Sequence, residues 1–215
     1  MSAYELVQLE KMVEELGEDR VKSILSSFES LYENDVEKFL KYKAIEFGKQ
    51  GLAKTQLIFL EINKIRHLVG FFTLANKNFY ISSQAMGKKS NPKRINEGTR
   101  KRIKRFGTYD LDRCEYKITS LLIAQLGKNH NSEFNNPISG SEILMLACQE
   151  VKKGHDLFGG RFVYLECEDV EKLKDFYCSN GFVEFGKRDL DSDEESDFRG
   201  KYLIQMLRDL SNFEF

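Results

Sequence analysis

The 215-residue sequence has no tryptophan, only two prolines and no long apolar run. No uninterrupted apolar segment approaches the roughly 18 to 20 residues that span a bilayer, and the first fifteen residues, MSAYELVQLEKMVEE, are acidic and lack the apolar core of a signal peptide. We therefore expect a soluble, cytoplasmic protein with no membrane partner. The hydrophobic content of 41% is enough for one sizeable core and excludes a disordered, collagenous or coiled-coil protein.

Cysteine and histidine are also scarce. The four cysteines include no CxxC pair, and a chain of this length does not need disulfides to be stable, so we predict reduced and mostly buried thiols. The three histidines are too far apart in the sequence to form a metal-ligand pattern, and we predict no metal site. These residues are Cys114, Cys148, Cys167 and Cys178, and His67, His130 and His155.

The sequence has no overall excess of one charge, because 33 residues are basic and 34 are acidic. The charges are nevertheless unevenly distributed along the chain. Residues 1–40 carry ten acids and four bases, whereas residues 86–106 carry nine bases and the single acid Glu97. The net charge excludes a uniformly basic nucleic-acid-binding protein and leaves a local basic patch open. Such a segment binds RNA phosphates, or it forms a solvated helix whose charges pair with the acidic first 40 residues.

Hydrophobic periodicity predicts the order of the helices and strands. Helices are expected over residues 7–31 and 35–51, followed by an antiparallel hairpin with strands at 55–63 and 68–82 and a link at 64–67. The remaining elements are a strand at 119–128, a helix that includes Ile143 and Val151, a strand at 161–168, a helix capped by Asp169 and stopped by Asn180 and Gly181, and strands at 182–187 and 201–208.

This order predicts one α/β domain with a mixed, mainly antiparallel central sheet and helices on both faces. We place a helical extension at residues 1–34 and the domain itself at residues 35–215, with a basic insertion at 86–106. The acidic stretch 189–197 has six acids in nine residues and is predicted to be a solvated loop between the last two strands.

The segment 121–153 is a buried strand, a polar loop and the start of a helix. Backbone N–H groups at a helix N-terminus, together with the helix dipole, favour an anion such as phosphate. The alternative is an ordinary capping box, because Ser139 and Glu142 have the S-x-x-E spacing and such a box needs no ligand.

A second feature is the helix that ends in FYCSNGF at residues 176–182. A helix stopped by Asn-Gly before an aromatic strand is a common structural arrangement, in which Tyr177 belongs to the core or its rim. The phenol of Tyr177 is also able to protonate a leaving group.

Taken together, these segments resemble the GNAT superfamily of acyl-CoA-dependent N-acetyltransferases. The resemblance rests on LLIAQLGKN at 121–129, NPISGSEILMLA at 136–147, RFVYLECEDVEKLKDFYCSNGF at 161–182 and the closing hairpin. The earlier segment VGFFTLA at 69–75 is most similar to the branch that contains acetyltransferase toxins. The resemblance implies a GNAT-like fold over residues 35–210 and acetyl-CoA as co-substrate.

The resemblance also implies roles for residues at matching positions. The backbone at the end of the strand would bind the pantetheine arm and polarise the thioester carbonyl, and the following loop would hold the diphosphate. Tyr177 matches the tyrosine that protonates the departing thiolate. The loop departs from the family pattern, with Asn135 at the usual Arg or Gln position and Ile138 at the usual first Gly. The implied co-substrate-binding residues are Leu126, Gly127, Lys128, Asn136, Ile138, Ser139, Gly140 and Ser141.

The implied reaction transfers an acetyl group to a primary amine, which must lose a proton before or during the attack. Glu133 and Glu166 are candidate bases, and the base is left unassigned. The acceptor is a protein, a small molecule or, as in the toxin branch, aminoacyl-tRNA.

A different class of function is a non-catalytic module that keeps the fold and binds RNA or an acidic protein through residues 86–106. Exposed sheet edges favour a homodimer in either class.

Overall fold

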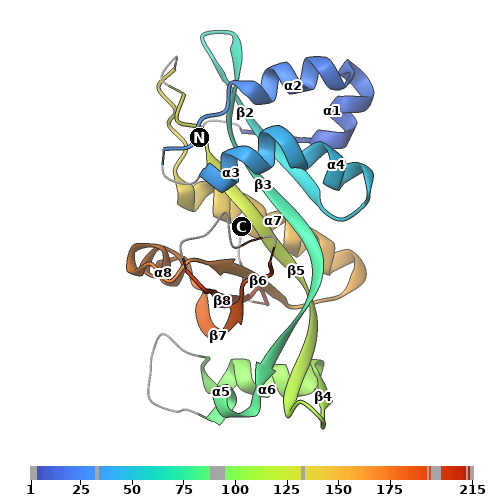
Figure 1. Cartoon of the computed structure of the whole chain (residues 1–215), viewed down its shortest axis with the longest axis vertical. Helices are drawn as coiled ribbons and strands as arrows, with labels where there is room; N and C mark the ends of the chain where they lie inside the picture. Colours follow the sequence, from blue (N-terminus) through green and yellow to red (C-terminus); the bar gives the residue numbers. More distant parts are fainter. Residues whose placement is uncertain are drawn as a thin grey trace. The chain divides into compact units, whose positions relative to one another are not determined.

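A computed structural model of the chain describes residues 4–31, 34–87, 95–131, 134–192, 194, 200–211 and 213. The chain divides into two compact units, one made of Met1–Ala75 and Ile123–Ala147 and the other of Asn76–Leu122 and Cys148–Phe215. Within the described residues, eight strands form a sheet in the order β1-β2-β3-β5-β6-β8-β7, with β4 paired to β5. Figure 1 labels these elements.

The first unit begins with a strand that periodicity did not predict. Its elements are β1 (Glu5–Gln8), α1 (Leu9–Leu16), α2 (Glu18–Ser26), α3 (Asn34–Lys38), the π-helix η1 (Phe39–Lys43), α4 (Ala44–Lys49), β2 (Lys54–Ile62), the first part of β3 (Ile65–Ser82), the end of β5 (Glu115–Lys128) and the start of α7 (Gly140–Phe158). The helix predicted over 7–31 is therefore shorter, and it is broken at Gly17, which has a φ of 82°. A positive φ suits glycine and interrupts a right-handed helix.

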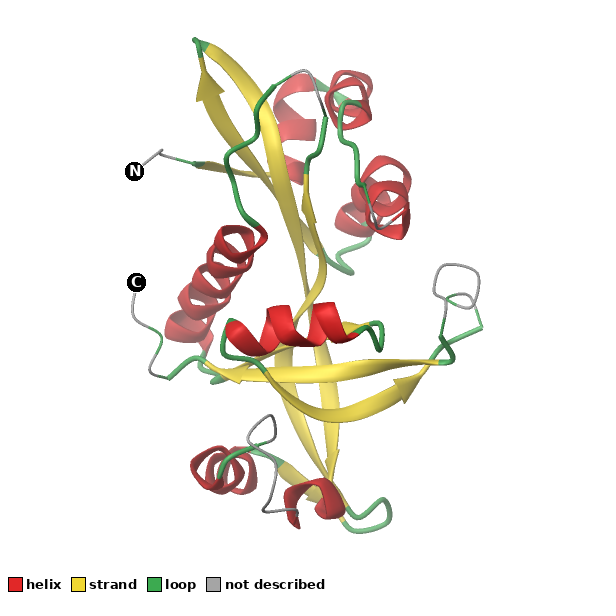
Figure 2. Cartoon of the chain, turned by 90° about the vertical axis from the view of Figure 1, so that its left-hand side faces the viewer, coloured by secondary structure: helices red, strands yellow, loops and turns green. Residues whose placement is uncertain are grey.

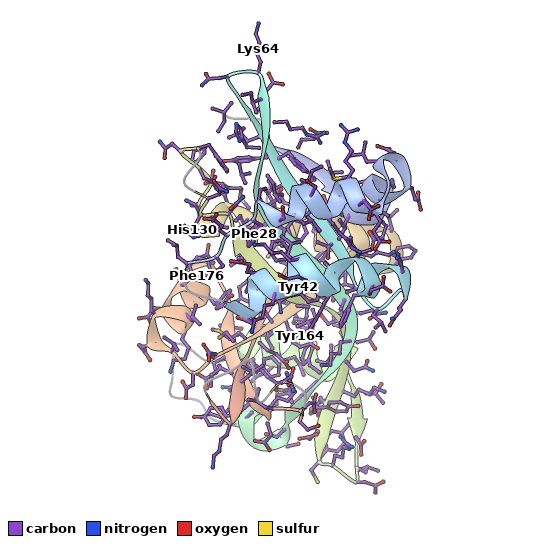
Figure 3. The ribbon with its side chains drawn as sticks, turned by 45° about the horizontal axis from the view of Figure 1, so that its top comes forward. Phe28, Tyr42, Lys64, His130, Tyr164 and Phe176 are labelled. Atoms are coloured by element: carbon purple, nitrogen blue, oxygen red, sulfur yellow. The ribbon has the colours of Figure 1, made fainter. Side chains whose placement is uncertain are left out.

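The hairpin of β2 and β3 is confirmed, with a tighter turn than predicted. Ile62 pairs with Ile65, so the turn consists of Asn63 and Lys64 alone, and both residues have positive φ. Such a two-residue turn matches the twist of the strands. Lys64 marks the tip of the hairpin in Figure 3.

Helices α1 to α4 pack their apolar side chains against one face of this hairpin (Figure 1). Leu9, Leu25 and Leu40 are fully buried there, and Phe28 meets Phe71 of β3 edge-on with 5.2 Å between ring centroids. Residues on both sides of position 34 thus share one hydrophobic cluster. The domain boundary at that position stays a prediction.

Strand β3 carries a bulge at Val69. Ile58 pairs with Gly70 and Phe59 pairs with Leu68, which leaves Val69 without a partner in β2. A Cβ atom on Gly70 would lie 2.8 Å from Cδ1 of Ile143 in α7. Because neighbouring residues of a strand face opposite sides, Phe71 faces the helices α1 to α4 and Gly70 faces α7. Helices therefore cover both faces of this part of the sheet.

The second unit holds the closing strands and the basic helix. Its elements are the end of β3, α5 (Ser83–Gly87), α6 (Glu97–Phe106), β4 (Thr108–Asp110), the start of β5, the end of α7, β6 (Phe162–Cys167), α8 (Glu171–Ser179), β7 (Val183–Asp189) and β8 (Tyr202–Asp209). Strand β8 pairs antiparallel with both β6 and β7. Figure 2 shows α8 beside these strands.

The basic segment forms a helix, as one reading predicted. Asn96 caps α6 by accepting a hydrogen bond from the Thr99 N–H at 2.8 Å, and Ile103 is fully buried. Arg102 donates to the Asp209 carboxylate at 2.7 Å, which ties α6 to the end of β8. Residues 88–94 of the predicted insertion lie outside the described part of the chain.

These observations confirm the predicted fold class of a mainly antiparallel sheet with helices on both faces. No helix in the described ranges is both long and apolar enough to cross a membrane. All four thiols are free, but only Cys148 and Cys167 are buried, and Cys114 lies exposed in the turn between β4 and β5. The prediction of mostly buried cysteines was therefore wrong for that turn.

Candidate functional site

The end of β5 packs tightly in the first unit. A Cβ atom on Gly127 would lie 2.7 Å from Val36 and within 2.9 Å of both Phe71 and Phe28. Gly127 is buried, whereas Leu126 and Lys128 on either side are half-buried. The glycine is thus required for packing against α3, β3 and Phe28, whatever its backbone binds.

Asn129 follows β5 and is a buried polar residue with 1% of its surface exposed. Its side-chain amide donates to the Leu68 carbonyl at 2.7 Å and to the Ser27 carbonyl at 3.4 Å, and its Oδ1 accepts from the Glu29 N–H at 3.0 Å. The Asn129 N–H donates to the Val69 carbonyl at 3.0 Å. Burying an amide without partners costs free energy, and here every group of the side chain has one.

Asn136 makes a second set of contacts in the same loop. Its Nδ2 donates at 2.7 Å to both the Val69 and the Asn129 carbonyls, and its Oδ1 accepts from the Ile138 N–H at 3.1 Å. Lys128 donates from Nζ to the Asn136 carbonyl at 3.2 Å. Lys128 and Asn136, both predicted as site residues, are therefore brought together.

The capping box predicted for Ser139 and Glu142 is present at the start of α7. The Ser139 N–H donates to the Glu142 carboxylate at 2.8 Å, and the Glu142 N–H donates to Ser139 Oγ at 3.2 Å. The hydrogen bonds from the Ser139 backbone and side chain lower the pKa of Glu142. Gly140 and Ser141 follow as the first two residues of α7.

Other titratable groups surround this helix start. The Tyr4 hydroxyl donates to the Glu142 carboxylate at 3.4 Å, and burial and then the Glu142 charge raise the pKa of Tyr4. Burial and then the Lys128 charge lower the pKa of His130, so its imidazole is neutral at pH 7. Figure 3 labels His130 and Phe28 in this unit. A lysine ammonium and a glutamate carboxylate thus lie at the same helix terminus.

Tyr177 lies on α8 in the second unit. Its ring meets those of Phe176 and Phe182 edge-on, with centroids 5.0 and 6.1 Å away, and the residue is half-buried. The predicted stop is confirmed, because the Gly181 N–H donates to the Cys178 carbonyl with a φ of 81° at Gly181. The half-buried position of Tyr177 agrees both with a structural role at the rim of the core and with a role as proton donor.

Two sequence-based interpretations near α8 need correction or completion. Asp169 does not cap the helix, because α8 begins after Val170 and the Asp169 carboxylate binds Lys174 at 2.7 Å and Tyr202 at 2.8 Å. Glu166 binds Arg188 at 2.8 Å and Gln205 at 2.9 Å, so this candidate base is held in an ion pair. Glu133 lies outside the described residues.

The exposed side of α6 combines cations with one aromatic ring. Lys101, Lys104 and Arg105 are exposed, and the Phe106 ring is 53% exposed. The guanidinium carbons of Arg105 and Arg161 lie 5.6 and 5.3 Å from the centroid of that ring. The sequence could not predict the approach of Arg161, since the two residues are far apart in the chain.

Of the residues that sequence reasoning did not predict for this site, Asn129 is the most notable. Its signal was present in the sequence, because an asparagine directly after a buried strand must find partners for its amide or face solvent. In the sequence, His130 stands out only as one of three scattered histidines. Its lowered pKa follows from burial that no sequence pattern shows.

Comparison with known proteins gives a fold and no family. No protein-family model matches the sequence, and no curated protein matches it either. AtaT complexed with acetyl-methionyl-tRNAfMet has a TM-score of 0.58 at 16% identity, covering 94% of each chain. A mutant of KacT gives 0.57 at 14%, covering 95% of this chain and 94% of that one. AtaTR bound with AcCoA gives 0.51 at 15%, covering 94% and 91%.

These likenesses extend over nearly the whole chain. At such identities they show the fold alone, and that fold is the one that the sequence resemblance implies.

Proposed function

We propose that the chain is an acetyl-CoA-dependent N-acetyltransferase that transfers the acetyl group to a primary amine. The observation that carries the proposal is the fold likeness, which extends over nearly the whole chain. One of the similar structures is AtaTR bound with AcCoA. The strand, loop and helix start around Lys128 and Gly140 support it, because they offer backbone donors, a helix dipole and a cation to an anionic ligand.

In this proposal the diphosphate of acetyl-CoA binds the N–H groups of Gly140 and Ser141, near the Lys128 ammonium. The N–H groups of Ile138 and Ser139 already donate to Asn136 and Glu142, so they bind phosphate only by exchanging partners. The main chain of Leu126, Gly127 and Lys128 takes the pantetheine arm and the thioester, as the family resemblance implies.

The reaction needs donors for the oxyanion, an acid for the departing thiolate and a base for the amine. The amine nitrogen forms a bond to the acyl carbon, the negative charge that develops on the carbonyl oxygen is stabilised by main-chain N–H groups, and the C–S bond breaks. The thiolate takes a proton from the Tyr177 hydroxyl. The proton that the amine loses passes to a base that we leave unassigned.

The proposal is tested by mass spectrometry of products. The full chain is incubated with acetyl-CoA and separate pools of small amines, peptides and charged tRNA. We expect acetylated product in one pool, dependent on Tyr177. Absence of product in all pools, with acetyl-CoA unconsumed, would favour the non-catalytic alternative.

For the acceptor we propose aminoacyl-tRNA, whose free α-amino group is a suitable nucleophile. Two observations support this choice: AtaT has been solved with acetyl-methionyl-tRNAfMet, and α6 presents exposed cations around Phe106. Cations bind phosphates without reading sequence, and an exposed ring can stack on an unpaired base.

The acceptor proposal is tested by tRNA binding at several salt concentrations. Each phosphate contact contributes about −0.9 to the slope of log K against log salt. The double reversal Lys104→Glu and Arg105→Glu should weaken binding and make the slope shallower by up to about 2. The matched reversal of two exposed lysines of the first unit, Lys11→Glu and Lys64→Glu, should leave both unchanged. Equal effects of the two pairs would remove α6 as an RNA surface.

A further inference from the structure

Side-chain hydrogen bonds hold the described residues of the segment between β5 and α7, which are 129–131 and 134–139. Two asparagines supply most of the contacts described for it. The Asn129 side chain binds main-chain groups of Ser27 and Glu29, which follow α2. The Asn136 side chain binds the main-chain N–H of Ile138, just before α7.

The bulge in β3 provides the anchor for both asparagines. Val69 has no partner in β2, and its carbonyl accepts from the Asn129 N–H at 3.0 Å and from Asn136 Nδ2 at 2.7 Å. The next carbonyl back, that of Leu68, accepts from Asn129 Nδ2 at 2.7 Å. A bulge commonly re-aims the backbone next to a functional site, and here it turns these carbonyls toward the loop.

The two asparagines are also joined directly. Asn136 Nδ2 donates to the Asn129 carbonyl at 2.7 Å, and Asn136 Oδ1 holds the Ile138 N–H. The next residue, Ser139, is the N-terminal half of the capping box. A continuous chain of hydrogen bonds therefore runs from the β3 bulge through Asn129 and Asn136 to the first turn of α7.

We propose that Asn129 and Asn136 are positioning residues, which hold the start of α7 in the position that receives the diphosphate of acetyl-CoA. This inference rests on the proposed function. Neither side chain touches the ligand in this account, and each acts through the backbone that it fixes. Asn136 is the better probe, because it is only half-buried and its replacement leaves the hydrophobic cluster intact.

The experiment compares Asn136→Ala with Asn131→Ala in the full chain. Asn131 is the matched control, since it is an asparagine of the same loop whose side-chain amide donates to the Ser27 carbonyl at 3.1 Å. Amide hydrogen exchange at residues 138–141 is measured first, without ligand. We expect faster exchange in Asn136→Ala only. Unchanged exchange would show that Asn136 does not hold this turn and would overturn the inference.

The second arm separates a positioning role from a merely structural one. Acetyl-CoA affinity should fall about tenfold in Asn136→Ala, the size expected for loss of one well-placed hydrogen-bonded group, with kcat within twofold. The KM for acetyl-pantetheine, which lacks the diphosphate, should not change. A general structural defect would raise both the Kd for acetyl-CoA and the KM for acetyl-pantetheine. That outcome would contradict the inference.

The two proposals fail in different ways. If the wild-type chain binds no acetyl-CoA, the proposed function and this inference both fall. If the wild type binds acetyl-CoA and Asn136→Ala binds it equally well, the inference alone is overturned.

Discussion

Glu142 is the single side chain that most opposes an anion at the start of α7. Its carboxylate receives two hydrogen bonds from Ser139, which lower its pKa and keep it ionised at pH 7. The same carboxylate accepts from Tyr4. A diphosphate at this terminus would meet both a favourable helix dipole and an unfavourable like charge.

We predict that Glu142→Gln strengthens acetyl-CoA binding. Glutamine preserves the capping box and removes the negative charge, so affinity should rise about threefold to fivefold, the size of a charge effect at a helix end. Calorimetric titration measures it, with Glu150→Gln later in the same helix as the control. Weaker binding in Glu142→Gln would mean that the carboxylate does not face the ligand.

Tyr177 carries the second prediction at this scale. If its hydroxyl protonates the thiolate, Tyr177→Phe should lower kcat about 100-fold and leave acetyl-CoA affinity nearly unchanged. Tyr202→Phe is the matched control, because the Tyr202 hydroxyl binds Asp169 and has no role in the proposed reaction. Equal turnover in Tyr177→Phe would remove the residue as the acid.

At the scale of elements, the Asp209 carboxylate joins α6 to the end of β8. Asp209, with 10% of its side chain exposed, binds Arg102 at 2.7 Å and Arg161 at 3.4 Å. Burial opposes ionisation, but hydrogen bonds from Ser211 and the two guanidinium charges lower the pKa of Asp209.

We predict that Asp209→Asn lowers the free energy of unfolding by about 1 to 3 kcal/mol, less than for a fully buried pair because both arginines are partly exposed. Urea unfolding measures this change. The exposed pair of Lys101 and Glu97 on the same helix is the control, and Glu97→Gln should change stability by less than about 0.5 kcal/mol. Similar losses in the two variants would show that Asp209 does not anchor α6.

Long elements with a clear period were predictable, and short or context-dependent ones were not. The hairpin, β5, α7 and the stop of α8 follow from alternation, apolar stripes and Asn180-Gly181. Strand β1 has four residues and forms because β2 pairs with it, which its own sequence does not show. The cap of α8 failed for a similar reason, since the Asp169 carboxylate is taken by Lys174 and Tyr202.

The candidate site was predictable in the same uneven way. The capping box of Ser139 and Glu142 was visible as an S-x-x-E motif, in which the two residues are three positions apart. The pairing of the Ile138 N–H with Asn136, and the network around Asn129, depend on a bulge in β3 that belongs to tertiary structure. No pattern within the loop itself contains that information.

For the whole molecule, the half-buried His130 and His155 set a pH dependence of stability. Burial lowers the pKa of both His130 and His155 below the unfolded value of about 6.5. The unfolded chain therefore binds more protons below pH 6.5, so stability falls as pH decreases from about 7 toward the lowered pKa values. Carboxylates with lowered pKa, such as Asp209, lose their contribution only below about pH 4.

We predict that His155→Gln flattens the fall in unfolding free energy between pH 7 and 5. Urea titrations of the wild type and of His155→Gln at several pH values measure this slope. A slope in His155→Gln equal to that of the wild type would show that the half-buried imidazole does not control stability in this range.

The central claim is that the strand, loop and helix start around Lys128 and Gly140 bind acetyl-CoA. The most direct measurement is calorimetric titration of the full chain with acetyl-CoA, supported by its melting temperature. We predict saturable binding of one molecule per chain and a rise of about 5 °C at a hundredfold excess over Kd. Absence of heat and of any shift at millimolar acetyl-CoA would contradict the account.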